Sequence, residues 1–252
     1  MKIEGKVAIV SGASSGLGQA CAQRLIARGC RVVGLDIAAP RWTPTTGSHD
    51  SFTSVVANVV DGESVQAAHD RAIDRFGHID IAICCAGVLH GERLVGREGP
   101  AKLDAFRRVL EINVIGTFNV IRFSAAAMMR NELTEESSER GVIVMTSSIA
   151  AFDGQIGQSA YSASKGAVAS MTLPIARELG AYGIRVVSIA PGVFETPMMQ
   201  GASEKVRQPL LEQTVFPKRF GLPHEYAELM EQVIANPMLN GTTIRLDGAL
   251  HM

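Results

Sequence analysis

Short apolar runs alternate with longer segments of helical spacing along the whole sequence, and this alternation restricts the possible folds most. The runs are continuous and rich in β-branched residues, which is typical of strands buried on both faces of a sheet. They cover Val7–Val10, Arg31–Leu35, Phe52–Ala57, Ile79–Cys84, Gly141–Thr146, Arg185–Ala190 and Thr243–Leu246. The helical segments cover Gly18–Ala27, Ser64–Phe76, Asp104–Met129, Tyr161–Leu179 and His224–Ile234. This order predicts an α/β fold, a Rossmann-like, doubly wound, seven-stranded parallel sheet with helices on both faces.

The length of 252 residues fits one α/β domain, and no linker rich in Pro, Gly or Ser divides the chain. We therefore expect a single domain over residues 1–252. Residues 197–223 depart from the strand–helix rhythm and include the apolar side chains of Met198, Met199, Leu210 and Phe216. Long connections in compact domains are usually functional or disordered, and the apolar content predicts a lid over a substrate site.

Composition and charge exclude several classes of protein. Apolar residues make up 46% of the chain and charged residues 19%, which excludes an intrinsically disordered protein. The chain has 24 Lys and Arg against 25 Asp and Glu, a formal net charge of −1. Proteins that bind nucleic acid usually carry an excess of basic residues. No stretch reaches the roughly 20 apolar residues that span a bilayer. We expect a small-molecule substrate, with neither a nucleic-acid nor a membrane partner.

The N-terminus and the cysteines bear on the cellular compartment. Residues 1–6 lead directly into the first strand, without an apolar signal core or an Arg-rich presequence. Cys21, Cys30, Cys84 and Cys85 show no CxxC spacing, which fits a reducing compartment. We expect a cytoplasmic protein, and a mitochondrial-matrix location stays open if a presequence is missing from this chain.

The sequence shows no cluster of metal ligands. The histidines are scattered, and we expect each of them at the surface: His49, His69, His78, His90, His224 and His251. The prediction is therefore that the protein has no metal site.

A glycine-rich turn follows the first strand, with Gly12, Gly16 and Gly18 inside residues 11–18. Glycines there let the backbone turn tightly and approach a pyrophosphate, whose charge is favoured at a helix N-terminus. The spacing is GxxxGxG. An ordinary strand–helix turn is the alternative interpretation, and the position at the first strand–helix junction favours cofactor binding.

Asp36 ends the second strand, at the offset where a carboxylate bonds the ribose hydroxyls of a dinucleotide. Such a carboxylate would repel the 2′-phosphate of NADP. Residue 37 is Ile and residues 13–19 contain no Lys or Arg that could neutralise this phosphate. Asp36 therefore favours NAD as the cofactor, with a purely structural cap of the loop as the alternative.

Tyr161 and Lys165 lie four residues apart, on one face of a predicted helix. A nearby ammonium favours the phenolate, so the Tyr161 phenol could exchange a proton with an alcohol. Ser148 follows a buried strand, at the end of a parallel sheet where ligand sites form. Its hydroxyl could hold the substrate oxygen, and the neighbouring Ser147 is an equal candidate by spacing.

Together these motifs resemble the short-chain dehydrogenase/reductase family over nearly the full length. The family's order and spacing are matched by the glycine turn, Cys85-Ala86-Gly87, Asn113, Ser148, Tyr161, Lys165 and Pro191-Gly192. Within the family, residues 116–122, 154–158, 171–177 and 240–249 are similar to the type II 3-hydroxyacyl-CoA dehydrogenases, also called type 10 17β-hydroxysteroid dehydrogenases.

The resemblance implies a role for each matching residue. Tyr161 would be the acid/base and Lys165 its partner, Ser148 would orient the reacting oxygen, and Asn113 would anchor a water in the proton relay. The substrate would meet Ser148, Gln155 and Tyr161. The NAD site would comprise Gly12, Ser15, Gly16, Leu17, Gly18, Asp36, Asn58, Val59, Cys85, Ala86, Gly87, Tyr161, Lys165, Pro191, Gly192, Phe194 and Thr196. Ser11 and Asn58 replace the family's usual Thr and Asp, and Asn58 can still bond adenine through its carbonyl.

The resemblance implies hydride transfer between NAD and (S)-3-hydroxyacyl-CoA or 3-oxoacyl-CoA thioesters, with short or 2-methyl-branched chains, in fatty-acid or branched-chain amino-acid breakdown. It also implies a homotetramer that uses the Tyr161–Leu179 helix and the Leu246–Met252 segment. Three alternatives stand beside it: a 3-oxoacyl carrier-protein reductase, a hydroxysteroid or other alcohol dehydrogenase, and a non-catalytic scaffold or RNA-processing subunit.

Overall fold

The predicted parallel sheet is confirmed in a computed structural model, which describes residues 1–44, 49–97, 99–133 and 138–251. Seven strands form one sheet in the order β3-β2-β1-β4-β7-β8-β9, and each neighbouring pair is parallel. They are β1 (Val7–Ser11), β2 (Arg31–Asp36), β3 (Phe52–Val56), β4 (Ile81–Cys84), β7 (Gly141–Thr146), β8 (Ile184–Pro191) and β9 (Thr243–Leu246). Every residue of β1, β4, β7 and β8 is buried, which explains why their sequences are largely apolar.

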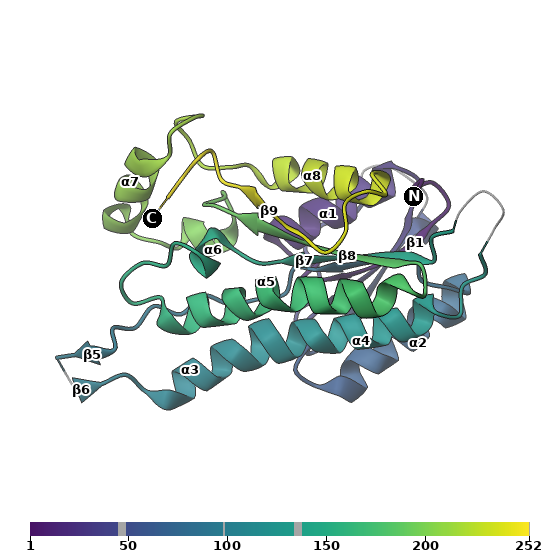
Figure 1. Cartoon of the computed structure of the whole chain (residues 1–252), viewed down its shortest axis with the longest axis horizontal. Helices are drawn as coiled ribbons and strands as arrows, with labels where there is room; N and C mark the ends of the chain where they lie inside the picture. The colour runs from purple at the N-terminus through teal and green to yellow at the C-terminus, as the bar shows by residue number, and fades with distance from the viewer. Residues whose placement is uncertain (45–48, 98, 134–137, 252) are drawn as a thin grey trace.

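Helices cover both faces of this sheet (Figure 1). One face carries α1 (Gly16–Ala27) and α8 (Pro223–Ala235), and the other carries α2 (Gly62–Phe76), α4 (Thr117–Met128) and α5 (Ser159–Gly180). The buried apolar residues accordingly form two clusters, one on each side of the sheet. The arrangement is the single, doubly wound, Rossmann-like domain that the strand–helix alternation predicts.

The register of the central strands sets the position of the site. Ser11 of β1 lies opposite Cys84 of β4, and Cys84 lies opposite Met145 of β7. The residues that follow these strands therefore leave the sheet along one edge. In open α/β sheets this carboxyl edge is where ligands bind.

Helix α3 (Leu103–Leu110) continues through a π-helical turn, Glu111–Gly116, into α4. The combined helix Leu103–Met128 is long and apolar enough to cross a membrane by length and composition, but 50% of its most apolar window is buried inside the protein. It packs against α2, α5 and the sheet, as the core helix of a globular domain does.

Two features lie outside the predicted strand–helix pattern. The segment predicted as a lid contains two helices, α6 (Pro197–Gln200) and α7 (Glu204–Gln213). A small antiparallel pair, β5 (Val95–Gly96) and β6 (Gly99–Pro100), projects from the sheet domain beside α3 (Figure 1). Two-residue strands are too short to produce a periodic pattern, so no local pattern in the sequence predicts them.

The prediction of a surface position is wrong for His69, which is buried between α2 and α4. Its ring nitrogens bond the Val65 carbonyl and the Ser124 hydroxyl, both at 2.8 Å, and burial lowers the pKa of the ring. His90, His224 and His251 are exposed, and the His49 side chain lies outside the described residues. Among the described residues, no group of three or more His, Cys, Asp or Glu could hold a metal ion.

Candidate active site

The carboxyl edge of the sheet opens into a cavity of about 450 Å³. Its volume falls in the usual range of ligand pockets. The cavity is lined by every residue predicted to bind cofactor or substrate: Gly12, Ser15, Gly16, Leu17, Gly18, Asp36, Asn58, Val59, Cys85, Ala86, Gly87, Ser148, Gln155, Tyr161, Lys165, Pro191, Gly192, Phe194 and Thr196. Residues from distant parts of the chain thus converge on one site.

The glycine turn between β1 and α1 is packed too tightly for side chains. Gly12 has φ +70°, and a Cβ added there would lie 2.8 Å from the Ala86 nitrogen. A Cβ on Gly18 would lie 2.2 Å from the Gly12 carbonyl oxygen. The Ser11 hydroxyl accepts hydrogen bonds from the backbone of Cys85 (3.2 Å) and Ala86 (3.3 Å), which fixes the turn against the segment after β4.

The N-terminus of α1 fits an anion. Ser15 occupies the N-cap, and its side chain makes no capping hydrogen bond within the described residues. The first-turn N–H groups of a helix need acceptors, and a phosphate supplies them together with the charge that the helix dipole favours. The bare glycine backbone beside this helix end leaves room for a pyrophosphate.

Asp36 both supports a loop and lines the cavity. Its Oδ2 accepts a hydrogen bond from the Ser14 nitrogen at 3.0 Å, and its Oδ1 accepts one from the Ala38 nitrogen at 3.3 Å. The structural cap considered from the sequence is therefore present, and the carboxylate still faces the cavity. Among the described residues that line the cavity, the cations are Lys165 on α5 and Arg108 on α3.

The loop after β3 is anchored to α4. The Asn119 amide on α4 donates to the carbonyls of Val59 (2.9 Å) and Val60 (3.2 Å). Asn58 lines the cavity, and its side-chain carbonyl already accepts a hydrogen bond from the Val60 nitrogen at 3.1 Å. An adenine amino group would therefore share this oxygen with the backbone.

The structure distinguishes the two serines that follow β7. The Ser148 hydroxyl hydrogen-bonds the Tyr161 phenol and accepts from the Ala150 nitrogen at 3.1 Å. The Ser147 hydroxyl instead donates to the Lys165 carbonyl of α5 at 2.9 Å. Both serines line the cavity, but only the Ser148 hydroxyl bonds the phenol, whereas the Ser147 hydroxyl ties the strand end to the helix.

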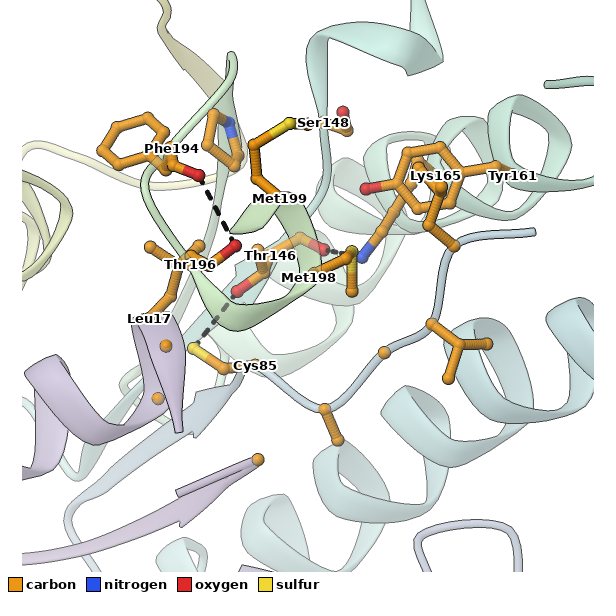
Figure 2. A pocket seen from close by; sticks show the side chains of 18 of the residues that line it. Leu17, Cys85, Thr146, Ser148, Tyr161, Lys165, Phe194, Thr196, Met198 and Met199 are labelled. Carbon is orange, nitrogen blue, oxygen red and sulfur yellow. Dashed lines mark hydrogen bonds between the residues drawn. The ribbon is translucent and has the colours of Figure 1, made fainter. Parts of the chain in front are cut away.

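Lys165 lies one turn after Tyr161 on α5 (Figure 2). Its Nζ donates to the Thr146 carbonyl at 2.8 Å and lies 5.8 Å from the centre of the Tyr161 ring. Burial raises the pKa of the Tyr161 phenol, and the Ser148 hydrogen bond lowers it. The net direction of the Tyr161 pKa is therefore upward, and not the lowering expected from Lys165, because burial outweighs the charge of an ammonium that is directed to Thr146.

The comparison with known families decides the assignment. The sequence pattern of the short chain dehydrogenase family matches residues 6–207, which include the glycine turn, Ser148, Tyr161 and Lys165. The chain is a short-chain dehydrogenase.

Known relatives of this short-chain dehydrogenase align with almost its whole length. The 3-hydroxyacyl-CoA dehydrogenase type-2 of Rattus norvegicus is 46% identical over 99% of this chain and 97% of its own length. The Drosophila melanogaster protein of the same name is 46% identical over 99% of both chains. The crystal structure of 3-hydroxyacyl-CoA dehydrogenase type-2 from Mycobacterium avium superposes with a TM-score of 0.89 and 36% identity, covering 100% of this chain and 98% of that one. The protein is therefore an oxidoreductase of a family that depends on NAD or NADP.

Asn113 is the predicted site residue that does not line the cavity of this short-chain dehydrogenase. It is buried in the π-helical turn. Its Oδ1 accepts from the Val88 nitrogen at 2.8 Å, and its Nδ2 donates to the Val88 carbonyl (2.9 Å) and the Ser164 hydroxyl (3.0 Å). Both amide hydrogens are used within the protein, so the side chain positions the loop after β4 against α5.

Thr146 is the site residue that the sequence reasoning missed. Its carbonyl holds Lys165, and its hydroxyl donates to the Cys85 sulfur at 3.3 Å (Figure 2). The available signal was its place as the last residue of a buried strand, directly before Ser147 and Ser148. The sequence analysis also did not predict four apolar residues that line the cavity: Leu89, Ile149, Ala202 and Val206.

Replacing Lys165 with Met should change how the stability of this short-chain dehydrogenase depends on pH. Burial lowers the Lys165 pKa from 10.5 to about 8, so between these pH values the unfolded chain binds more protons than the folded one. The Lys165 contribution therefore becomes more favourable as pH rises, by about 1.4 kcal/mol per unit. From pH 8 to 10, the free energy of unfolding of the unmodified protein should rise by roughly 2–3 kcal/mol relative to the variant.

Urea unfolding at several pH values measures this difference. The matched control is Lys205→Met, at an exposed position on α7. For this variant, the difference in the free energy of unfolding from the unmodified protein should not change with pH. A pH-independent difference for Lys165→Met would show that the ammonium is not destabilised by burial.

Proposed function

We propose that the protein is an NAD-dependent dehydrogenase that interconverts (S)-3-hydroxyacyl-CoA and 3-oxoacyl-CoA thioesters with short or 2-methyl-branched chains. The observation that carries the proposal is the convergence of Ser148, Tyr161, Lys165 and Asp36 on one cavity. The substrate class is supported by the 46% identity, over almost the whole chain, to proteins named 3-hydroxyacyl-CoA dehydrogenase type-2.

The side chains can perform alcohol oxidation as follows. Ser148 hydrogen-bonds the substrate hydroxyl and holds it beside the Tyr161 oxygen, and the Tyr161 phenolate removes the hydroxyl proton. Lys165 adds positive charge near the phenol, which counteracts the effect of burial on the phenol pKa. When bound, NAD would accept the hydride from C3, and its cationic ring would add further positive charge beside Tyr161. In the reverse direction, Tyr161 returns the proton to the carbonyl oxygen.

The preference for NAD rests on Asp36. Its carboxylate lines the cavity and can accept hydrogen bonds from two ribose hydroxyls, but it would repel a 2′-phosphate. A 3-oxoacyl carrier-protein reductase would usually prefer NADPH and a basic residue near the cofactor turn, and residues 13–19 offer none. This charge pattern favours the dehydrogenase over that reductase.

We also propose that residues 197–223 act as a lid over the acyl chain. Met198 and Met199 line the cavity from this segment (Figure 2), and so do Val206 and Leu210 of α7. Arg207 of α7 pairs with Glu195 at 2.8 Å and donates to the Met199 carbonyl at 3.1 Å, which fastens α7 to the loop after β8. A hydroxysteroid could also use so apolar a wall, so the substrate must be tested directly.

Rates of NAD-linked oxidation should separate the substrate classes. We expect the highest kcat/KM with (S)-3-hydroxybutyryl-CoA and 2-methyl-3-hydroxybutyryl-CoA, and a much lower value with estradiol. Failure with all three would contradict the substrate assignment while leaving the family unaffected, and activity with estradiol alone would favour the hydroxysteroid alternative.

We propose that the protein assembles as a homotetramer. Ile115, Phe118 on α4 and Leu173 on α5 are 50%, 46% and 44% exposed, although they are apolar. Helices α4 and α5 run side by side on one face of the sheet, so these side chains can form a shared contact surface (Figure 1). Sedimentation velocity gives the mass, and a monomer at micromolar concentration would contradict this proposal.

A further inference from the structure

Cys85 differs from the other cysteines in its position. All four lie in the described part of the chain, where Cys21, Cys30 and Cys84 are buried and Cys85 is half-buried. Cys85 follows β4, and its side chain lines the proposed cofactor cavity (Figure 2). A thiol in this position is accessible to small molecules that enter the cavity, and the proposed dehydrogenase mechanism does not use it.

Polar groups surround the Cys85 sulfur on its buried side. The Thr146 hydroxyl donates to Sγ at 3.3 Å, and the same hydroxyl is 2.7 Å from the phenol oxygen of Tyr226, which is fully buried. Cys21 of α1 also hydrogen-bonds Cys85. Cys85 also packs against the buried apolar cluster that contains Cys21, although the two residues are 64 positions apart in the sequence.

The surroundings of Cys85 and Cys21 shift the pKa values of the two thiols in opposite directions. The hydrogen bond from Cys21 lowers the pKa of Cys85 most, and Thr146 and the Lys165 charge lower it further, against the effect of burial. Burial raises the pKa of Cys21, so this thiol keeps its proton and can donate it. Burial also raises the pKa of Cys30 to about 12 and that of Cys84 well above its ordinary value. Thiolates are the reactive form, so Cys85 is the favoured nucleophile.

We propose that Cys85 and Cys21 form a peroxide-reactive thiol pair that closes reversibly to a disulfide beside the cofactor cavity. The Cys85 thiolate attacks one oxygen of hydrogen peroxide, the O–O bond breaks, and hydroxide leaves, which gives a sulfenic acid on Cys85. Cys21 sulfur then attacks Cys85 sulfur, and the S–O bond breaks. The Cys21 proton leaves with the hydroxyl group as water. Peroxide is reduced and the two thiols are oxidised, so atoms and electrons balance.

The disulfide would disturb the nucleotide end of the site. Cys21 lies on α1, the helix that the glycine turn opens, and Cys85 lies in the segment against which that turn packs. The glycine turn and the segment after β4 are packed too tightly to move independently, since a Cβ on Gly12 would lie 2.8 Å from the Ala86 nitrogen. Drawing Cys85 toward α1 also removes the acceptor of the Thr146 hydroxyl. Loss of activity should therefore accompany the bond.

The experiment treats the protein with hydrogen peroxide, alkylates the remaining thiols and maps peptides without reduction. The expected product is a peptide pair linked through Cys21 and Cys85. Dehydrogenase activity should fall in proportion to this product and return with dithiothreitol. In Cys21→Ala, Cys85 should instead proceed to the sulfinic acid, and its activity should not return with dithiothreitol.

Cys30→Ala is the matched control, because Cys30 is buried in the same apolar cluster as Cys21. This variant should still form the Cys21–Cys85 disulfide. The proposal is overturned if all four thiols remain open to alkylation under denaturing conditions, or if Cys30 or Cys84 is oxidised before Cys85.

Addition of NADH separates this proposal from the proposed cofactor site. Slower oxidation of Cys85 in the presence of NADH supports both the thiol pair and the cofactor site, because a bound nucleotide would cover Cys85. Formation of the disulfide at an unchanged rate would support the thiol pair and contradict the placement of the nucleotide.

Discussion

Tyr161→Phe should lower kcat/KM for the oxidation of (S)-3-hydroxybutyryl-CoA by roughly 10³-fold. The phenol oxygen hydrogen-bonds Ser148 inside the cavity, and the proposed mechanism has it accept the substrate proton. Phe keeps the ring and its packing on α5 but removes that oxygen. Because the change acts on the proton transfer, kcat should fall more than KM changes, and steady-state kinetics measure both.

Tyr182→Phe is the control for this prediction. Tyr182 follows α5, is 42% exposed and does not line the cavity, so the same loss of a phenol oxygen there should leave kcat/KM unchanged. If Tyr161→Phe retains a rate close to that of the unmodified enzyme while circular dichroism shows an intact fold, another group must accept the proton.

The sequence was sufficient for the sheet, because burial on both faces leaves a simple pattern. Every residue of β4 and β7 is buried and all but Thr146 lack polar side chains other than a thiol, and the predicted ends of both strands fall within two residues of those in the structure. The residues that follow these strands lie at one edge as a consequence of parallel pairing. The positions of Ser148 and Cys85 at the cavity were therefore predictable from local sequence.

Other features depend on contacts that no local pattern contains. Ser147 and Ser148 are adjacent, and only the packing of α5 against β7 shows that Ser147 bonds a helix carbonyl while Ser148 meets Tyr161. His69 looks like a surface residue until α4 supplies Ser124 as its partner. The lowered pKa of Lys165 likewise arises from burial in the folded protein, not from its neighbours in sequence.

Asp36→Asn should weaken the preference for NAD over NADP by about 10²-fold. The substitution keeps a side chain of the same shape, which can still accept from the Ser14 nitrogen, but it removes the negative charge. Loss of charge-assisted hydrogen bonds to the ribose should lower kcat/KM with NAD by roughly 10- to 100-fold. Removal of the repulsion should at the same time raise kcat/KM with NADP.

The ratio of kcat/KM for NAD to that for NADP is the decisive measurement, because damage to the fold would lower both values together and leave their ratio unchanged. Asp61→Asn serves as the control. The Asp61 carboxylate also caps a backbone N–H, that of Glu63 at 3.0 Å, but Asp61 does not line the cavity. Its substitution should leave the ratio unchanged. If the unmodified enzyme already prefers NADP, Asp36 serves only to support the Ser14–Ala38 loop, and the assignment of NAD is wrong.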